Sequence, residues 1–334
     1  MSDLVTVAIP AYNAQSTLDE TLLSVRRQGY HGLEIFVVDD GSTDATARIA
    51  QRHAAEDARI TVVHKPNGGV ATARNAGLER ATAPLFACVD ADDIWHPDKI
   101  AAQVASLRNA GPDVLLSYTW FAYIDESNQI LSTAEPCDEG FVIPRLCRGN
   151  VVGNGSSPLM TTRALREVGG WDADPAIDGN EDYKLYFTLA ERGAFAVVKS
   201  HLLGYRQSRQ NKSSQALKML AGYDRVAAAF RPRHLEYSDQ FTAGRGELIS
   251  YLFDKAVLNQ KWQAAACLLR EASRHDSTMF RKLLLTAPRI VIRMIVPLRT
   301  RARWQKAGPG GRLKAKSFLA DCVGPGTTHT DCLA

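Results

Sequence analysis

The sequence lacks the features that mark several special classes of protein. Its six cysteines include no C-x-x-C pair, which argues against a zinc ribbon or thiol redox motif and fits reduced thiols better than a disulfide framework. No uncharged apolar run reaches the roughly 18 residues that a membrane-spanning helix needs. The first residues show neither the basic nor the apolar region of a secretory signal, so we expect a cytoplasmic protein.

Acidic residues are absent from one stretch near the C-terminus. Residues 277–320 contain 11 Lys or Arg and no Asp or Glu, whereas the rest of the chain has 29 of the 40 basic residues against all 36 acidic ones. An acidic body with one basic segment argues against a nucleic-acid binder and favours a single localised anionic partner. The 334 residues, 45% hydrophobic and 23% charged, are otherwise typical of a soluble globular protein of about two domains.

Strands and helices alternate along the first ninety residues. A helix is expected between Ser16 and Gly29, where a capping-box pattern precedes apolar residues at helical spacing. The other expected elements are strands at 4–9, 33–38, 60–64 and 85–89, and helices at 44–55 and 70–80. Apolar strands joined by helical crossovers predict an α/β fold with a mostly parallel central sheet and helices on both faces.

The second half of the chain has a less regular pattern. The expected strands span residues 114–121, 194–198 and 202–205, and the expected helices span 162–168, 183–191, 216–231 and 246–272. Residues 149–157 form a Gly/Ser/Asn-rich loop. The last two helices predict a C-terminal helical extension, followed by a Gly- and Pro-rich tail at 308–334 that is expected to be flexible.

Carboxylates follow two of the predicted parallel strands. Asp39 and Asp40 come after the second strand, and Asp90 and Asp92 after the fourth. Parallel strands end at the same sheet edge, which is where open α/β sheets bind ligands. Crowded carboxylates repel one another unless a cation lies between them, and a hard divalent cation prefers such oxygen ligands. The alternative is that these side chains are simply solvated at loop tips.

An ordered set of motifs resembles the family 2 glycosyltransferases. The motifs are VAIPAYN at 7–13, DDGSTD at 39–44, GGVATARNAG at 68–77, DADD at 90–93, GGWD at 169–172, ED at 181–182 and YR at 205–206. The resemblance covers residues 4–210. It implies a GT-A fold and transfer of a sugar from a nucleotide diphosphate to an acceptor hydroxyl with inversion. Mn²⁺ or Mg²⁺ is the cofactor that it implies.

The resemblance also assigns roles at the donor end. Asp92 would hold the metal, with Asp90 assisting or touching the ribose, and Asp39 and Asp40 would accept hydrogen bonds from base and ribose. Arg74 would approach the diphosphate, unless it forms a salt bridge on the helix surface. The residues predicted to bind the nucleotide sugar are Pro10, Tyr12, Asn13, Asp39, Asp40, Arg74, Asp90 and Asp92. Plain packing is the alternative for Tyr12.

An inverting reaction needs a general base opposite the leaving diphosphate. Glu181 and Asp182 at a predicted helix start fit this need, and the family pattern puts the base at Asp182. Glu181 would then support the base or bind the acceptor. The alternative is that both carboxylates only stabilise the helix N-terminus.

Three segments are expected along the chain. Residues 1–210 would form the catalytic domain, with a nucleotide-binding half at 1–105 and an acceptor half at 106–210, and residues 211–307 a basic helical extension before the tail. The basic segment, with Arg299, Arg301 and Arg303, is predicted to dock on the inner face of an anionic membrane. The alternative is packing on the catalytic domain.

Competing functions remain open. A sugar-nucleotide nucleotidyltransferase would carry a Gly-rich basic loop after the first strand, which Pro10-Ala11-Tyr12-Asn13 does not provide. A non-catalytic sugar-nucleotide-binding scaffold is the other alternative. A processive synthase is disfavoured because Thr300 stands where its Gln-x-x-Arg-Trp motif needs Gln. A UDP- or dTDP-sugar donor and a polysaccharide or lipid-linked glycan acceptor are the expected substrates, with no nucleic-acid partner.

Overall fold

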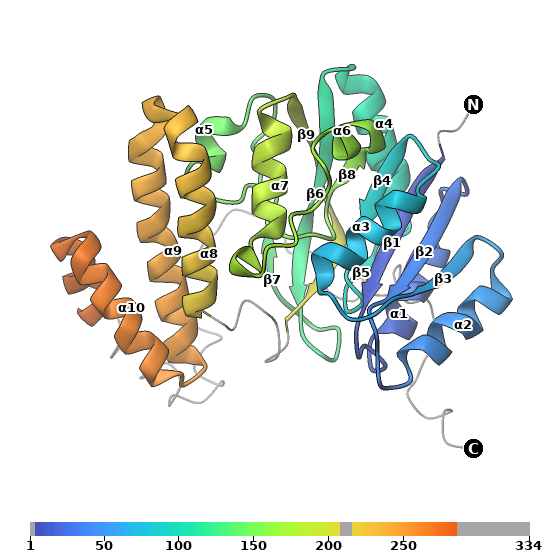
Figure 1. Ribbon diagram of the computed structural model, residues 1–334, viewed down its shortest axis with the longest axis horizontal. Helices are drawn as coiled ribbons and strands as arrows, with labels where there is room; N and C mark the ends of the chain where they lie inside the picture. The colour runs from blue at the N-terminus through green and yellow to red at the C-terminus, as the bar shows by residue number, and fades with distance from the viewer. Residues whose placement is uncertain (1–3, 208–215, 286–334) are drawn as a thin grey trace.

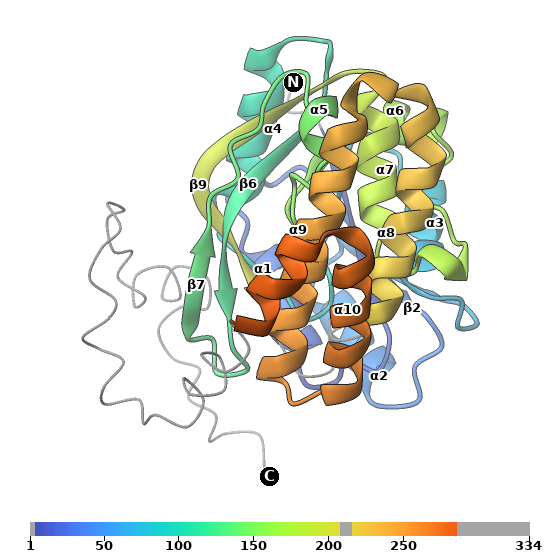
Figure 2. The ribbon, with the colours of Figure 1, turned by 90° about the vertical axis from the view of Figure 1, so that its left-hand side faces the viewer.

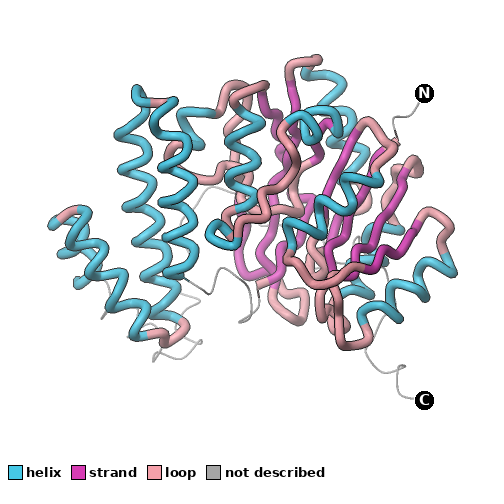
Figure 3. Tube along the Cα trace, viewed as in Figure 1, coloured by secondary structure: helices cyan, strands magenta, loops and turns pink. Residues whose placement is uncertain are grey.

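The computed structural model describes residues 4–207 and 216–285. Within these residues, nine strands form one sheet of order β3-β2-β1-β4-β8-β6-β9-β5, with β7 paired to β6 (Figures 1 and 3). The first four strands, β1 (Val5–Ala11), β2 (Leu33–Asp39), β3 (Ile60–His64) and β4 (Leu85–Cys88), run parallel. The predicted α/β class with a mostly parallel sheet is therefore confirmed.

The register of these strands brings the predicted motifs to one edge. Ala11 of β1 lies opposite Asp39 of β2, and Ala8 lies opposite Cys88 of β4. The loops that follow β1, β2 and β4 consequently emerge side by side. This arrangement is what the sequence predicts from right-handed parallel connections.

The second half of the chain extends the sheet. The added strands are β5 (Ile94–Trp95), β6 (Val114–Ile124), β7 (Ile130–Ala134), β8 (Leu159–Thr161) and β9 (Ala194–Arg206). The prediction of two short closing strands is wrong, because β9 is continuous along β6. Its register shifts where Thr119 pairs with Val198 and Trp120 with His201, so the intervening polar residues Lys199 and Ser200 are accommodated as an exposed irregularity.

Helices cover both faces of the sheet. On one face, α1 (Leu18–Arg26), α2 (Thr46–Glu56) and α4 (Lys99–Ala110) bury apolar residues against the strands. On the other, α3 (Val70–Arg80), α6 (Thr162–Glu167) and α7 (Glu181–Ala190) share a second core, and α5 (Ile143–Leu146) joins it. Figure 1 shows α3 and α7 in front of the sheet. Helix α4 was not among the predicted elements.

Helix α7 is positioned by aromatic packing against the C-terminal helices. Tyr183 stacks on Tyr223 of α8 (Ala216–Phe230) with ring centroids 5.7 Å apart, and Phe187 stacks on Phe230 at 4.2 Å. Figures 1 and 2 show α8 beside α7 with α9 (Ser238–Leu258) next to it. The first helix of the extension thus shares a core with the helix that carries Glu181 and Asp182.

The prediction of one helix over 246–272 is wrong. The structure has two helices, α9 and α10 (Trp262–His275), separated by a turn in which Gln260 has φ 57°. The exposed polar residues of this turn let the chain reverse, so that Leu268 packs in the same core as Leu252.

Much of the predicted basic segment lies outside the described residues. The part beyond Leu285, including Arg299, Arg301 and Arg303 and the tail at 308–334, is not described, so membrane docking stays a prediction, as does the division near residue 210. Among the helices of the described ranges, none combines the length and apolar character needed to cross a membrane.

Candidate active site

The predicted site residues, apart from Asp39, line one cavity of about 2060 Å³ at the carboxyl edge of the sheet. Its walls include Tyr12 after β1, Asp92 after β4 and Asp182 at the start of α7. Residues of α8 and α9, such as Tyr223 and Tyr251, close another side. The volume is about twice the upper end of common small-ligand pockets, roughly 300–1,000 Å³, so the cavity has room for two substrates.

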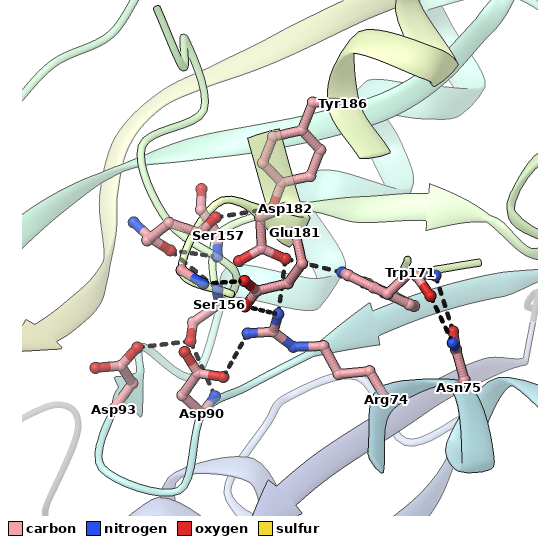
Figure 4. Close-up of polar contacts among 12 residues, drawn as sticks. Arg74, Asn75, Asp90, Asp93, Ser156, Ser157, Trp171, Glu181, Asp182 and Tyr186 are labelled. Carbon is pink, nitrogen blue, oxygen red and sulfur yellow. Dashed lines mark hydrogen bonds and ion pairs between the residues drawn. The ribbon is translucent and has the colours of Figure 1, made fainter. Parts of the chain in front are cut away.

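A buried arginine lines this cavity and contacts three carboxylates (Figure 4). Only 2% of the Arg74 side chain is exposed. Its Nη1 donates to Asp182 Oδ1 at 2.8 Å and to Glu181 Oε1 at 3.3 Å, and its Nη2 donates to Asp90 Oδ1 at 2.8 Å. Arg74 is therefore no helix-surface salt bridge. It joins the loop after β4 to the first turn of α7.

Asp182 is the carboxylate best placed to accept a proton. Burial raises its pKa to about 6, although the Arg74 charge acts in the opposite direction. Its Oδ1 accepts from Arg74 and from Trp171 Nε1, which is 2.8 Å away. No described residue donates a hydrogen bond to its Oδ2.

Glu181 differs from Asp182 in that both of its oxygens are occupied. Oε1 accepts from Arg74 at 3.3 Å, and Oε2 accepts from the backbone N–H of Gly179 at 2.6 Å. The residue is almost fully buried. Among the described residues, both Glu181 oxygens therefore have a donor, whereas Asp182 Oδ2 has none. The roles of base and support stay predictions.

The loop after β4 crowds its carboxylates. Burial, helped by the negative charge of Asp90, raises the pKa of Asp92 to about 6, while Arg206 opposes the shift. Asp93 is fully buried, and burial raises its pKa as well. Its oxygens accept from Ser156 Oγ at 2.5 Å and from the Arg206 backbone N–H at 2.8 Å, so Asp93 shapes the loop from the interior.

Asp90 and Asp92 fit the divalent cation that the family resemblance implies. The negative charge of Asp90 adds to burial in raising the pKa of Asp92, and a cation between the two carboxylates would oppose both effects. Nowhere in residues 4–207 and 216–285 do three or more His, Cys, Asp or Glu side chains gather as a metal site. A cation here would therefore need further oxygens from a bound ligand, as diphosphate provides.

Asp39 and Asp40 are occupied by the protein's own loops. Asp40 accepts from the backbone N–H groups of Gly68 and Gly69 at 3.0 and 2.8 Å, and from Lys65. Asp39 accepts from the Ser42 N–H at 3.0 Å and pairs with a histidine of β3. Asp40 lines the cavity whereas Asp39 does not. Their predicted contacts with base and ribose stay predictions.

The loop after β1 lines the cavity and carries an exposed aromatic side chain. Tyr12 is 53% exposed, so packing in the interior does not explain it. Asn13 adopts φ 48° and its Oδ1 accepts from the Thr43 N–H at 2.9 Å, which fixes this loop to the loop after β2. Pro10, Tyr12 and Asn13 all line the cavity.

Three site residues were not found from the sequence. Trp171 donates to Asp182, Ser156 binds both Asp93 and the Asp90 backbone N–H, and Gly155 lies against Arg74 and Asp182. Trp171 belongs to a recognised motif, but nothing local shows which side chain its N–H meets. In the 149–157 loop, only the abundance of small residues could have indicated that Gly155 and Ser156 belong to the site.

Comparisons with known proteins identify the family. The model of the family described as glycosyl transferase family 2 matches residues 6–161. The putative teichuronic acid biosynthesis glycosyltransferase TuaG of Bacillus subtilis is 30% identical over 217 residues, which cover 64% of this chain and 83% of that protein. An uncharacterized glycosyltransferase of Rickettsia prowazekii is 25% identical over 78% of this chain and 81% of its own. The chain belongs to glycosyl transferase family 2.

Solved structures share its fold. The mannosyltransferase PcManGT from Pyrobaculum calidifontis, in complex with GDP-Man and Mn²⁺, aligns with a TM-score of 0.56 and 18% identity over 96% of this chain and 86% of that one. Staphylococcus aureus TarS in complex with UDP aligns with a TM-score of 0.52 and 16% identity over 86% and 91%. The GT-A fold implied by the motifs is thereby confirmed, and the chain is a glycosyltransferase of that type.

Proposed function

We propose that this glycosyltransferase moves one sugar from a nucleotide-diphosphate donor to an acceptor hydroxyl with inversion at the anomeric carbon. The supporting observation is the Arg74 bridge, which holds Asp90 of the donor-side loop and Asp182 of α7 on one cavity. A role in surface-polysaccharide or lipid-linked glycan synthesis is supported by the similarity to TuaG.

The donor end lies between the loops after β1, β2 and β4. UDP- or dTDP-sugars are the proposed donors, and the complexes of TarS with UDP and of PcManGT with GDP-Man add GDP-sugars to the set worth testing. Asp92 and Asp90 would hold Mn²⁺ or Mg²⁺. When bound, such a cation supplies positive charge against the developing charge of the leaving diphosphate.

Asp182 supplies the general base. The acceptor hydroxyl gives its proton to Asp182 Oδ2 while its oxygen attacks the anomeric carbon. The bond from that carbon to the diphosphate oxygen breaks, and the nucleoside diphosphate leaves with the electron pair. Because Oδ1 is held by Arg74 and Trp171, Oδ2 is the oxygen left for this transfer.

The acceptor end is assigned to the part of the cavity formed by α8 and α9. Tyr223, Leu248 and Tyr251 line it, next to the loop that contains Asn150. The Tyr251 ring, which is 51% exposed, suits a sugar, whose apolar ring face stacks while its hydroxyls find hydrogen bonds. A glycan acceptor, free or lipid-linked, is therefore proposed.

The test is a panel of UDP-, dTDP- and GDP-sugars with Mn²⁺, scored by thermal stabilisation and by release of the nucleoside diphosphate. Turnover of one donor supports the proposal, and NMR of the sugar product reports inversion. Binding without turnover, with acceptors from bacterial envelope glycans present, would favour the scaffold alternative. Pyrophosphate release from a nucleoside triphosphate and a sugar phosphate would favour a nucleotidyltransferase.

A further inference from the structure

Two neighbouring residues of helix α3 are linked to Asp182, one directly and one through Trp171. Arg74 donates to Asp182 Oδ1 directly, at 2.8 Å. Asn75 does not touch Asp182, but its amide holds the backbone of Trp171 with two hydrogen bonds. Its Nδ2 donates to the Trp171 carbonyl at 2.7 Å, and its Oδ1 accepts from the Trp171 N–H at 2.8 Å (Figure 4).

Trp171 connects Asn75 to the proposed base, Asp182. Its indole Nε1 donates to the same Asp182 oxygen, Oδ1, at 2.8 Å. The ring is 2% exposed and packs on Phe86 with centroids 5.9 Å apart, so the N–H has little freedom to point elsewhere. Two donors on one oxygen restrain the rotation of the carboxylate and leave Oδ2 as the oxygen without a donor among the described residues.

The space around Oδ2 is kept open by a glycine. A Cβ at Gly155 would lie 2.7 Å from Asp182 Oδ2 and would also collide with Arg74 Nη2. Gly155 does not have positive φ, so close approach, and not backbone conformation, explains the absence of a side chain. Alanine at this position would displace the carboxylate, the guanidinium or both.

A second glycine lies beside the two hydrogen bonds between Asn75 and Trp171. Gly170 adopts φ 72°, and a Cβ there would collide with Asn75 Oδ1. The Asn75–Trp171 pairing therefore depends on a residue without a side chain, just as the Arg74–Asp182 pairing does. In both pairings, a glycine leaves the space that a hydrogen-bonding side chain occupies.

We propose that Arg74, Asn75 and Trp171 act together as positioning residues for Asp182, so that a helix of the nucleotide-binding half sets the geometry of the base. The inference rests on the proposed function. It gives the ARN and GGW segments a common task, while the contact of Arg74 with the diphosphate stays a prediction. None of the three donates or accepts the transferred proton.

The test uses the full chain and compares Trp171→Phe with wild type. Phenylalanine keeps an aromatic ring but removes the N–H, so the fold is retained while Oδ1 loses one donor. Loss of one hydrogen bond to a charged group predicts a kcat about 10- to 100-fold lower. The KM for the donor that the panel selects, and the affinity for UDP with Mn²⁺, should stay within about twofold.

Trp120→Phe is the matched control. Trp120 Nε1 donates to the Pro136 carbonyl at 3.1 Å, and Trp120 does not line the cavity, so this variant should keep wild-type kcat. Gly155→Ala is the second test variant and should lower kcat in the same way without a change in thermal unfolding temperature large enough to indicate misfolding.

An independent readout is the indole N–H resonance of Trp171 among the five tryptophans, assigned by its loss in Trp171→Phe. Asp182→Asn should shift this resonance and leave that of Trp120 in place. Wild-type kcat in Trp171→Phe, or equal losses of kcat and UDP affinity, would overturn the positioning role while leaving the proposed function standing. Absence of wild-type turnover with every donor and acceptor would overturn both.

Discussion

At the scale of single residues, the site depends on carboxylates that burial makes weaker acids. Asp182 and Asp92 both have pKa values raised to about 6, in each case with burial as the largest cause. For a carboxyl group, a raised pKa means that the charged form is lost already in mildly acidic solution. Both proposed roles, base and metal ligand, need the charged form.

The first prediction concerns pH. Saturating Mn²⁺ should hold Asp92 in its charged form. The fall of the rate on the acidic side of the pH profile then reports the protonation of Asp182. The rate should fall about tenfold for each unit below pH 6 and level off above it. The measurement is kcat/KM for donor turnover between pH 4.5 and 8 in buffers of constant ionic strength. A flat profile over that range would remove Asp182 from the role of base.

The second prediction concerns metal. Asp92→Asn should weaken Mn²⁺-dependent binding of the nucleoside diphosphate by at least tenfold, because one charged oxygen ligand is lost. Calorimetric titration with UDP, with and without Mn²⁺, measures this. Asp98→Asn, an exposed residue that does not line the cavity, is the control and should bind as wild type. Full turnover in excess EDTA would contradict the metal assignment.

At the scale of helices and strands, the sequence predicted those features that a local pattern of apolar residues determines. Strand ends carrying Asp39 and Asp90 were located because apolar runs end abruptly, and parallel connections put them on one edge. The turn that ends α9 was missed because the apolar spacing continues on both sides of Gln260. Contacts between distant segments, such as Trp171 with Asp182, have no local signal at all.

Helix α9 packs closely against the loop that contains Arg148 at the cavity wall. A Cβ at Gly244 would lie 2.6 Å from the Arg148 carbonyl carbon and closer still to its oxygen, while Arg148 forms an ion pair with Glu247 one turn along. The glycine thus lets α9 approach the loop at the cavity wall. A backbone neighbour cannot move aside as a flexible side chain can.

The third prediction follows from that contact. Gly244→Ala should lower the free energy of unfolding by about 1–3 kcal/mol, the usual cost of overpacking, although alanine is ordinarily the better helix former by up to about 1 kcal/mol. Chemical denaturation measures the change. Gln263→Ala, at an exposed position of α10, is the control and should change stability little. A more stable Gly244→Ala would show that α9 does not press on the loop.

At the scale of the whole molecule, charge is distributed unevenly. The basic stretch at 277–320 contrasts with an acidic remainder. Its first residues, 277–285, are helical and follow α10, in the same extension whose α8 and α9 line the cavity. A membrane contact through this stretch would hold the enzyme on the surface that presents a lipid-linked acceptor. Each basic residue near anionic lipid adds about 1 kcal/mol to such binding.

The fourth prediction tests that contact. Full-length protein should co-sediment with vesicles containing anionic phosphatidylglycerol but not with neutral phosphatidylcholine vesicles, and salt should release it. Replacing Arg299, Arg301 and Arg303 with serine should reduce binding by more than tenfold, since three charges are removed. Equal, salt-insensitive behaviour of both proteins on both vesicle types would leave the segment as structural.

We propose that one cavity holds two separate functions, donor binding at the 90–92 loop and proton removal at Asp182. The decisive experiment compares Asp182→Asn with wild type for donor turnover and for UDP binding with Mn²⁺, in the same preparation. Turnover should be lower by roughly 10²- to 10⁴-fold, with nearly unchanged UDP affinity. Turnover close to that of wild type, or a loss of UDP affinity as large as the loss of turnover, would contradict it.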